Sequence, residues 1–188
     1  MRTVPWWAVL SSACAPVLLI GGWQLAAARQ PDGFDPVRQT ISALAARGAT
    51  KPWIMTTALA GVGVCHMTTA AGLASAAVPG RALLAAGGAA TVSLAALPLP
   101  ITGDSSAHVA AASIALPALS LWPALAARRG ARPGPAVWLP AAAGLLGLLS
   151  WFMIGYFSEG PRIGLSERVL AGAQALWPLA AVLLARRR

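Results

Sequence analysis

Two histidines and five carboxylates are the side chains of this sequence that could carry acid–base chemistry. His108 follows Asp104 by four positions, a spacing that places both side chains on one face of a helix. A carboxylate beside an imidazole can orient it as a general acid or base, and Asp35 is a second possible orienter. The alternative is that Asp104, Ser105 or Ser106 only caps a helix. The candidate catalytic residues are therefore His108, Asp104 and Asp35.

Other polar residues could bind a ligand without transforming it. Arg38 and Arg168 carry planar guanidinium groups that suit a carboxylate or a phosphate. Near Arg168, Ser166 can cap a helix, and Glu167 suits the positive end of that helix's dipole. Capping alone would account for both of these residues. The predicted binding residues are Asp35, Arg38, Ser42, His66, His108, Glu167 and Arg168.

His66 differs from His108 because it lies in the middle of an apolar run. A polar group within a bilayer needs a partner or a function. One interpretation is a hydrogen bond between helices, with partners among Thr56, Thr57, Thr68 and Thr69. The other is a proton relay or a cofactor ligand.

The two histidines are not expected to share a cofactor. At ~1.5 Å per residue, His66 lies roughly 20 Å below the membrane surface and His108 within about 5 Å of it. Two ligands of one metal must lie about 4 Å apart, at ~2 Å per bond. Cys14 and Cys65 each lie in an apolar run, which indicates helix packing and not a disulfide or a zinc site. We therefore predict no haem with two histidine ligands, no metal site and no cofactor.

The elements that must position these residues are membrane helices. The sequence is 57% hydrophobic and only 10% charged, too few charges to cover a soluble domain. Six runs are long enough to span a bilayer: 6–28, 53–74, 82–98, 107–127, 136–157 and 166–185. We predict one all-α domain over residues 1–188, a polytopic transmembrane helix bundle of about six spans.

The connection between the first two runs is long enough to contain structure of its own. Asp35-Pro36 is a good helix start and Gly48 a plausible stop. Between them Val37, Ile41 and Leu44 share one helical face. We predict a short amphipathic helix near residues 36–47, lying on the membrane surface or capping the bundle.

Basic residues give the expected orientation. Arg2, Arg81, the group Arg128, Arg129 and Arg132, and the terminal Arg186, Arg187 and Arg188 lie on one side. The other side has six basic residues and all five acidic ones, with no tight arginine cluster. Both termini are therefore predicted in the cytoplasm, with the candidate site outside. The first apolar run exceeds the length usual for a cleaved signal peptide, so no cleavage is expected.

The net charge of +9 fits anionic lipid headgroups. No basic stripe with interleaved aromatic residues is present, so nucleic-acid binding is not expected. Membrane lipids are the expected partners. A protein partner or self-association is left open.

The sequence resembles the bacterial membrane family called domain of unknown function nine-nine-eight. The resemblance rests on the segment from Phe34 to Leu44, Trp53, His66, His108 and the pair Glu167-Arg168. It implies about six helices, an extracytoplasmic polar site and the bacterial plasma membrane, but no reaction. The sequence also has a distant similarity to membrane hydrolases of the alkaline-ceramidase type. Those enzymes bind zinc through three histidines, whereas this sequence has only two.

Three functions are consistent with these observations. The first is an outward polar site that binds a lipid headgroup or a partner protein. The second is an enzyme that acts on lipid at that face, with His108 as general acid or base. The third is a small transporter, which is disfavoured because few polar residues lie within the spans.

Overall fold

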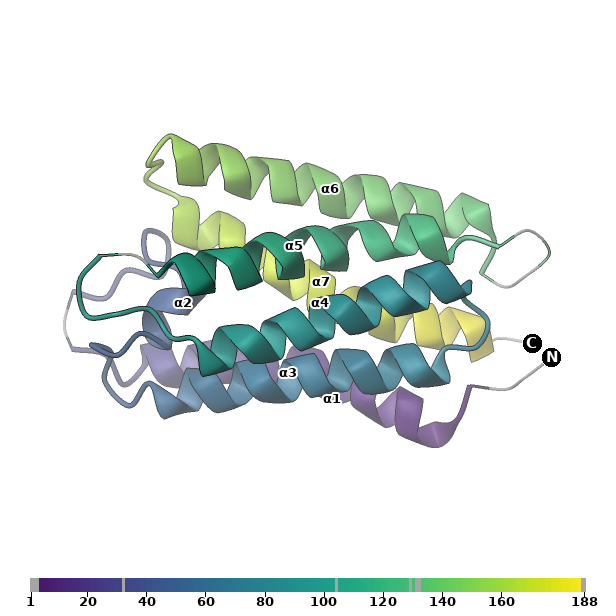
Figure 1. Cartoon of the computed structure of the whole chain (residues 1–188), viewed down its shortest axis with the longest axis horizontal. Coiled ribbons are helices and arrows are strands. Elements are labelled where there is room, and N and C mark those ends of the chain that lie inside the picture. Colours follow the sequence, from purple (N-terminus) through teal and green to yellow (C-terminus); the bar gives the residue numbers. More distant parts are fainter. Residues whose placement is uncertain (1–3, 32, 104, 129, 131–132, 187–188) are drawn as a thin grey trace.

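The computed structural model describes all residues except 1–3, 32, 104, 129, 131–132 and 187–188. Its described residues form no strand, six long helices and one short helix (Figure 1): α1 (Trp6–Ala27), α2 (Ile41–Leu44), α3 (Trp53–Gly72), α4 (Val78–Ala96), α5 (Ser106–Ala126), α6 (Pro135–Phe157) and α7 (Ile163–Arg186). The six long helices have the length and hydropathy of membrane spans. They confirm the all-α class and the six predicted spans, so the chain is a multi-pass membrane protein.

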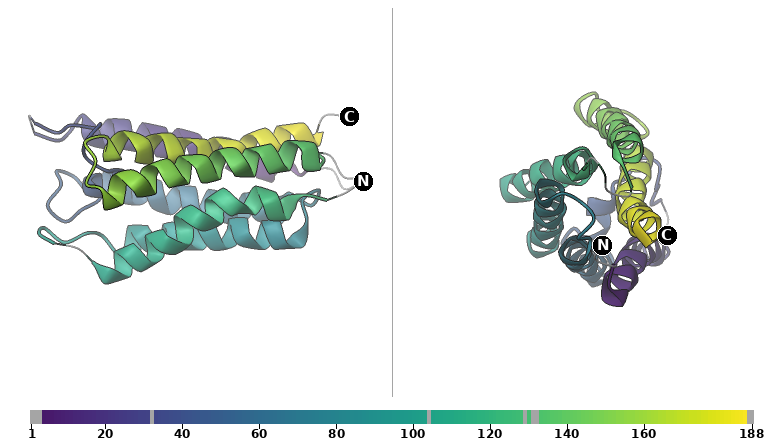
Figure 2. Two further views of the ribbon diagram at one scale, coloured as in Figure 1. Left: turned by 90° about the horizontal axis from the view of Figure 1, so that it is seen from above. Right: turned by 90° about the vertical axis from the view of Figure 1, so that its right-hand side faces the viewer.

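The long helices form a closed ring in sequence order. Each packs on the next, and α7 returns to α1. The end-on view of Figure 2 shows this arrangement. Because the number of spans is even, α1 begins and α7 ends at the same end of the bundle, here called the terminal end. The opposite end carries the connections 28–52, 97–105 and 158–162 and is here called the loop end.

Small residues bring α3 and α4 close together. A Cβ atom added to Gly88 would lie 2.6 Å from the carbonyl oxygen of Gly63. At the end of α4 near Arg81, one added to Gly80 would lie 2.7 Å from the Cβ of Ala126 in α5. Lipid gives helices no hydrophobic reason to associate, so this close packing supplies the attraction.

Polar contacts add to this packing. The Gln174 amide of α7 donates to the Leu116 carbonyl at 2.8 Å and to the Ser120 hydroxyl at 2.9 Å, both in α5. The Arg81 guanidinium donates to the carbonyls of Ala70 and Ala71 at 2.7 and 2.8 Å. Arg81 thereby satisfies two carbonyls that the end of α3 leaves without helical partners.

Three tryptophan rings pack against one another at the terminal end. The rings of Trp122 and Trp138 are 5.4 Å apart, and those of Trp138 and Trp177 are 6.1 Å apart, both edge to face. The Trp138 indole donates to the Pro133 carbonyl at 2.7 Å. This cluster joins α5, α6 and α7 through one compact apolar contact.

Two helices begin a few residues earlier than the approximate spans predicted from the sequence. The third span begins at Val78 instead of residue 82, because Pro79 occupies the first turn, where its missing N–H is harmless. The last span begins at Ile163 instead of Ser166. Ser166 therefore does not cap α7; its hydroxyl donates to the Ile163 carbonyl at 2.9 Å.

Candidate functional site

The connection 28–52 lies over the loop end, and hydrogen bonds join residues near its two ends. The Gln30 amide donates to the Thr50 carbonyl, and the Thr50 N–H donates to the Gln30 side chain, each at 3.0 Å. The Arg47 N–H donates to the Leu99 carbonyl at 3.0 Å. The connection is thus joined both to itself and to the neighbouring connection 97–105.

The predicted helix at 36–47 exists only in part. Asp35 does not start it: its carboxylate accepts the Val37 N–H at 2.8 Å and forms a turn. The helix starts at Ile41, where the Thr40 hydroxyl caps it by accepting the Ala43 N–H at 3.2 Å. The turn breaks the helix because the aspartate side chain offers its backbone a local alternative partner.

The apolar face of α2 points into the bundle. Ile41 and Leu44 are buried in a cluster that includes Leu19 of α1 and Met55 of α3. Val37, which was expected on the same face, is largely exposed. The short helix therefore caps the bundle, one of the two positions predicted for it.

Glu167 binds the start of α2. Its carboxylate accepts the Ile41 N–H, and the Ser42 N–H lies against the same group. These N–H groups have no partner within a helix that is only beginning. Glu167 does stabilise a helix start, but that of α2 and not that of its own helix.

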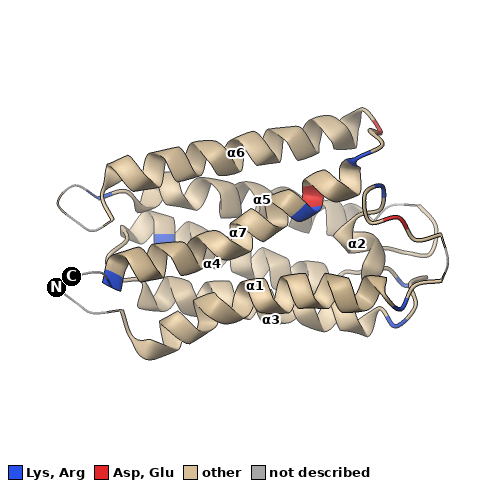
Figure 3. Cartoon of the chain, turned by 180° about the vertical axis from the view of Figure 1, so that it is seen from behind, with Lys and Arg blue, Asp and Glu red and all other residues tan. Residues whose placement is uncertain are grey.

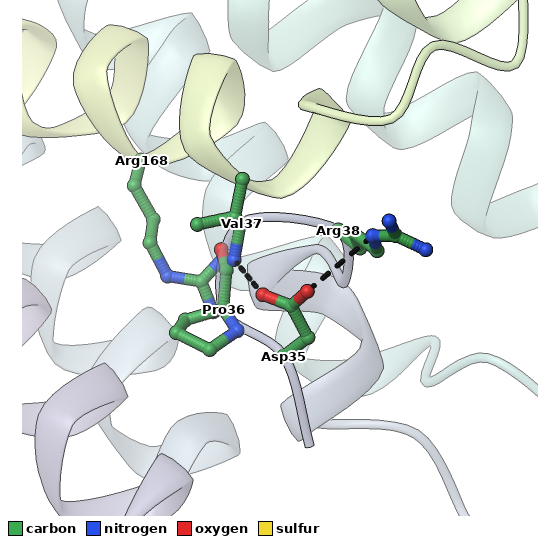
Figure 4. A network of polar contacts seen from close by, with 5 residues as sticks. All are labelled: Asp35, Pro36, Val37, Arg38 and Arg168. Atoms are coloured by element: carbon green, nitrogen blue, oxygen red, sulfur yellow. Dashed lines mark hydrogen bonds and ion pairs between the residues drawn. The ribbon is translucent and has the colours of Figure 1, made fainter. Parts of the chain in front are cut away.

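Arg168 binds the carbonyls of the preceding turn. One guanidinium nitrogen donates to the Pro36 carbonyl at 2.7 Å and to the Gln39 carbonyl at 2.6 Å. The same nitrogen donates to the Gly164 carbonyl at 3.0 Å. Figure 4 shows the Arg168 side chain reaching the turn that contains Asp35 and Pro36. Adjacent residues of α7 thus bind opposite backbone groups of one connection: Glu167 binds donors and Arg168 binds acceptors.

The first turn of α7 lies directly against the same segment. The Leu165 N–H donates to the Val37 carbonyl at 3.0 Å. A Cβ atom added to Gly164 would lie 2.7 Å from the Pro36 carbonyl oxygen. Only glycine permits this approach, and the sequence analysis did not identify Gly164 as a residue of the site.

Asp35 and Arg38 pair with each other at the surface. Their closest atoms are 3.5 Å apart, and their side chains are 45% and 72% exposed. An ion pair this exposed contributes little, because water screens it. Figure 3 shows the described acidic residues at the loop end, whereas basic residues occur at both ends.

His108 connects the connection 28–52 to the start of α5. Its Nδ1 lies 2.8 Å from the Leu97 carbonyl, and its Nε2 lies 3.2 Å from the Ser42 hydroxyl. A carbonyl oxygen only accepts hydrogen bonds, so Nδ1 carries the proton. In a neutral imidazole, Nε2 is then unprotonated and accepts the hydrogen bond of the Ser42 hydroxyl. Ser105 caps α5 by accepting the His108 N–H at 3.3 Å, as one predicted alternative had it.

A cavity of about 320 Å³ opens beside this pair, between α5 and α6. Thr40, Ser42, His108 and Glu167 line it together with the Tyr156 ring. The remainder of its wall is mostly apolar and includes Val109, Ala112, Leu116, Leu149, Phe152 and Met153. The cavity therefore has polar groups near one end and an apolar body.

The structure places six of the seven predicted binding residues, all except His66, in three different regions. Ser42, His108 and Glu167 line the cavity. Arg168 holds the backbone of the connection, and Asp35 with Arg38 lies at the surface. Asp104, the other candidate orienter, lies outside the described residues. The Leu97 carbonyl orients His108, a role that sequence could not reveal because every residue has a carbonyl.

His66 is buried in α3 and does not line the cavity. A Cβ atom at Gly88 would lie 3.0 Å from the Cβ of His66, so α4 covers it closely. One of the two interpretations of His66 was a hydrogen bond to a threonine; its Nδ1 has no partner among the described residues. Thr69 pairs instead with Ser11 of α1 at 2.8 Å. The described residues contain no group of three side chains suited to a metal ion.

The comparison with known families gives one match. The model of the family described as "Protein of unknown function (DUF998)" matches residues 12–184. Neither the curated proteins nor the solved structures contain a significant match. The matched range extends from within α1 to near the end of α7, and so includes the connection 28–52, His108 and the Glu167-Arg168 pair.

Proposed function

The chain belongs to the DUF998 family of membrane proteins of unknown function, and we propose that it binds an amphipathic lipid in the cavity at the loop end. One observation carries this proposal. The cavity between α5 and α6 is apolar along most of its wall and polar near Ser42 and His108. An acyl chain would occupy the apolar body, and the polar part of the lipid would contact the hydroxyl and imidazole groups.

The charged residues near the cavity limit which polar group the ligand can carry. Arg168 donates to three backbone carbonyls, and Arg38 pairs with Asp35 at the surface. Neither guanidinium lines the cavity, whereas the Glu167 carboxylate does. A phosphate would meet a carboxylate there without a compensating cation. The group nearest Ser42 and His108 is therefore not an anion, and we propose a polar group without negative charge, such as an ester or a hydroxyl.

The proposal is tested with a photoreactive fatty-acyl lipid in nanodiscs. Ala112 lines the cavity from α5, so A112F fills part of the space that the chain would occupy. Ala110 is exposed on the same helix and does not line the cavity, so A110F is the matched control.

The expected result is crosslinking to peptides of α5 and α6 that A112F reduces and A110F leaves unchanged. Both variants are checked for folding by size exclusion and thermal melting. Equal crosslinking in folded A112F, A110F and the unchanged protein would contradict the proposal.

We further propose that the protein lies in the bacterial plasma membrane with both termini in the cytoplasm, so that the cavity opens near the outer surface. The arginine clusters of the sequence support this orientation. Reporter fusions at Gly80, Gly130 and the carboxyl terminus should read cytoplasmic, and those at Gly103 and Gly160 should read external. A cytoplasmic signal from Gly103 in the intact chain would reverse the orientation.

A further inference from the structure

The hydrogen bond between Ser42 and His108 differs from those of many other hydroxyl groups in the molecule. Thr91 and Ser93 of α4 each donate to a carbonyl four residues earlier in their own helix. Such bonds satisfy a hydroxyl locally and leave it without chemistry. Ser42 contacts an imidazole 66 positions away, at a distance of 3.2 Å.

Of the two neutral tautomers of His108, the contact with Leu97 selects the one whose Nε2 can take a proton. The Leu97 carbonyl accepts from Nδ1 at 2.8 Å and so fixes the ring and its tautomer. His108 is buried. A hydroxyl, a base within hydrogen-bond reach and a third group that orients the base are the elements of an activated nucleophile.

The pair lies where a substrate would reach it, because Ser42 and His108 both line the cavity assigned above to a lipid. We propose that Ser42 is a nucleophile for acyl transfer from an ester-linked lipid, with His108 as its general base. This inference rests on the proposed lipid binding and adds the substrate class, a carboxylic ester of a long-chain acyl group.

The chemistry balances without any cofactor. The Ser42 Oγ attacks the ester carbonyl carbon while its proton passes to His108 Nε2. The tetrahedral intermediate collapses, the bond from carbon to the leaving oxygen breaks, and His108 returns the proton to the leaving alcohol. Water then attacks the acyl-serine with His108 again as base. His108 then returns the proton taken from the water to the Ser42 Oγ as the acyl–oxygen bond breaks. The products are an alcohol and a carboxylic acid, and Ser42 is regenerated.

Other groups at the site have supporting roles. Thr40 and Tyr156, which both line the cavity, each carry a hydroxyl of the kind that can donate to the oxygen on which negative charge develops. Glu167 is a positioning residue, since its carboxylate binds the backbone N–H of Ile41, next to the nucleophile. It therefore fixes where α2 presents Ser42.

The inference is tested with a long-chain fluorophosphonate, which phosphonylates activated serines. Purified protein in nanodiscs is incubated with the probe, and the modified residue is identified by peptide mass spectrometry. We expect modification at Ser42, its loss in S42A and no change in S93A. Ser93 is the control because its hydroxyl donates within its own helix and it does not line the cavity.

Replacing His108 tests whether the probe labels Ser42 because the hydroxyl is activated or only because it is accessible. H108Q removes the base but keeps an amide that can donate to the Leu97 carbonyl, so it is the conservative variant beside H108A. The labelling rate should fall at least about 100-fold in both, as is typical when a general base is lost. Each variant must elute and melt like the unchanged protein for its rate to count.

The lipid crosslinking assay distinguishes the two proposals. Crosslinking that persists in S42A, together with its loss of labelling, supports the acyl-transfer inference. Crosslinking without any labelling of Ser42 in the unchanged protein overturns this inference and leaves lipid binding intact. Equal labelling of Ser42 in folded H108Q and in the unchanged protein also overturns it.

Discussion

The α3–α4 interface and the loop end are held together in different ways. Midway along the interface, Gly63 and Gly88 let two helix backbones approach each other, and the charged contact of Arg81 lies only at the end of α3. At the loop end, Glu167 and Arg168 bind backbone N–H and carbonyl groups of the connection 28–52. Lipid offers no hydrogen bonds to backbone groups, so charged side chains bind the backbone where helices end and the chain is irregular.

The comparison also explains where a ligand cavity can form. Of the residues in the most apolar stretch of each helix, 50% are buried in α3 but only 22% in α6. Gly144 and Gly147 of α6 face open space, unlike the glycines of α3 and α4. The cavity lies along this loosely packed helix, and the connection 28–52 brings polar groups to one end of it.

The largest expected effect is the disruption of the close interface. In G88L the new side chain starts 2.6 Å from the Gly63 carbonyl oxygen, which neither backbone can avoid without separating the helices. We expect a loss of more than about 3 kcal/mol of unfolding free energy, the upper range for overpacking. The measurement is the yield of monodisperse protein and its denaturation in mild detergent.

The matched control is G147L in α6, where an added Cβ meets nothing within 4 Å. It should change the unfolding free energy by no more than about 0.5 kcal/mol, as at ordinary surface positions. If G88L were as stable as G147L, close backbone approach would not be what holds α3 to α4.

A smaller loss is expected from the charged pair at the loop end. E167A leaves the buried Ile41 N–H without its acceptor, and R168A releases the carbonyls of Pro36 and Gln39. Each should cost about 1–3 kcal/mol, the penalty for an unsatisfied buried group. Because both bind one segment, the double variant should show a coupling energy of roughly 0.5–3 kcal/mol. Strict additivity in this double-mutant cycle would show that the two residues act separately.

G164A tests whether the connection must lie directly against α7. The added methyl group would lie 2.7 Å from the Pro36 carbonyl oxygen and push the turn away. We expect a destabilisation of about 1–2 kcal/mol, at the lower end of overpacking costs. Hydrogen exchange should accelerate in residues 36–45 and remain unchanged in α3. Unchanged exchange in that segment would mean that the turn has room for a side chain.

The smallest effect is expected at the surface ion pair. R38A removes the contact with Asp35, but both side chains are well exposed. The unfolding free energy should change by less than about 0.5 kcal/mol, as for other screened pairs, and lipid crosslinking should persist. A loss comparable to that of R168A would show that Arg38 also holds the connection 28–52 in place.

Local properties of the sequence were sufficient to predict the spans. Six apolar runs became six helices because the length and hydropathy of a segment decide whether lipid accepts it. The grouping of polar residues at one end followed as well, since helices that alternate in direction return Ser42, His108 and Glu167 to the same end. The extent of α2 did not follow, because the Asp35 side chain binds the Val37 N–H in a turn and the helix starts only at Ile41.

The contacts that define the site were decided only by the tertiary structure. Asp35 was one expected partner of His108, yet Leu97 supplies a backbone carbonyl and Ser42 a hydroxyl from a distant segment. Glu167 was expected to serve its own helix, but it binds a backbone N–H 126 positions away. Residue types reveal which groups can donate or accept a hydrogen bond. Which backbone groups remain unpaired, and which side chains reach them, depends on where each helix ends and how the helices pack.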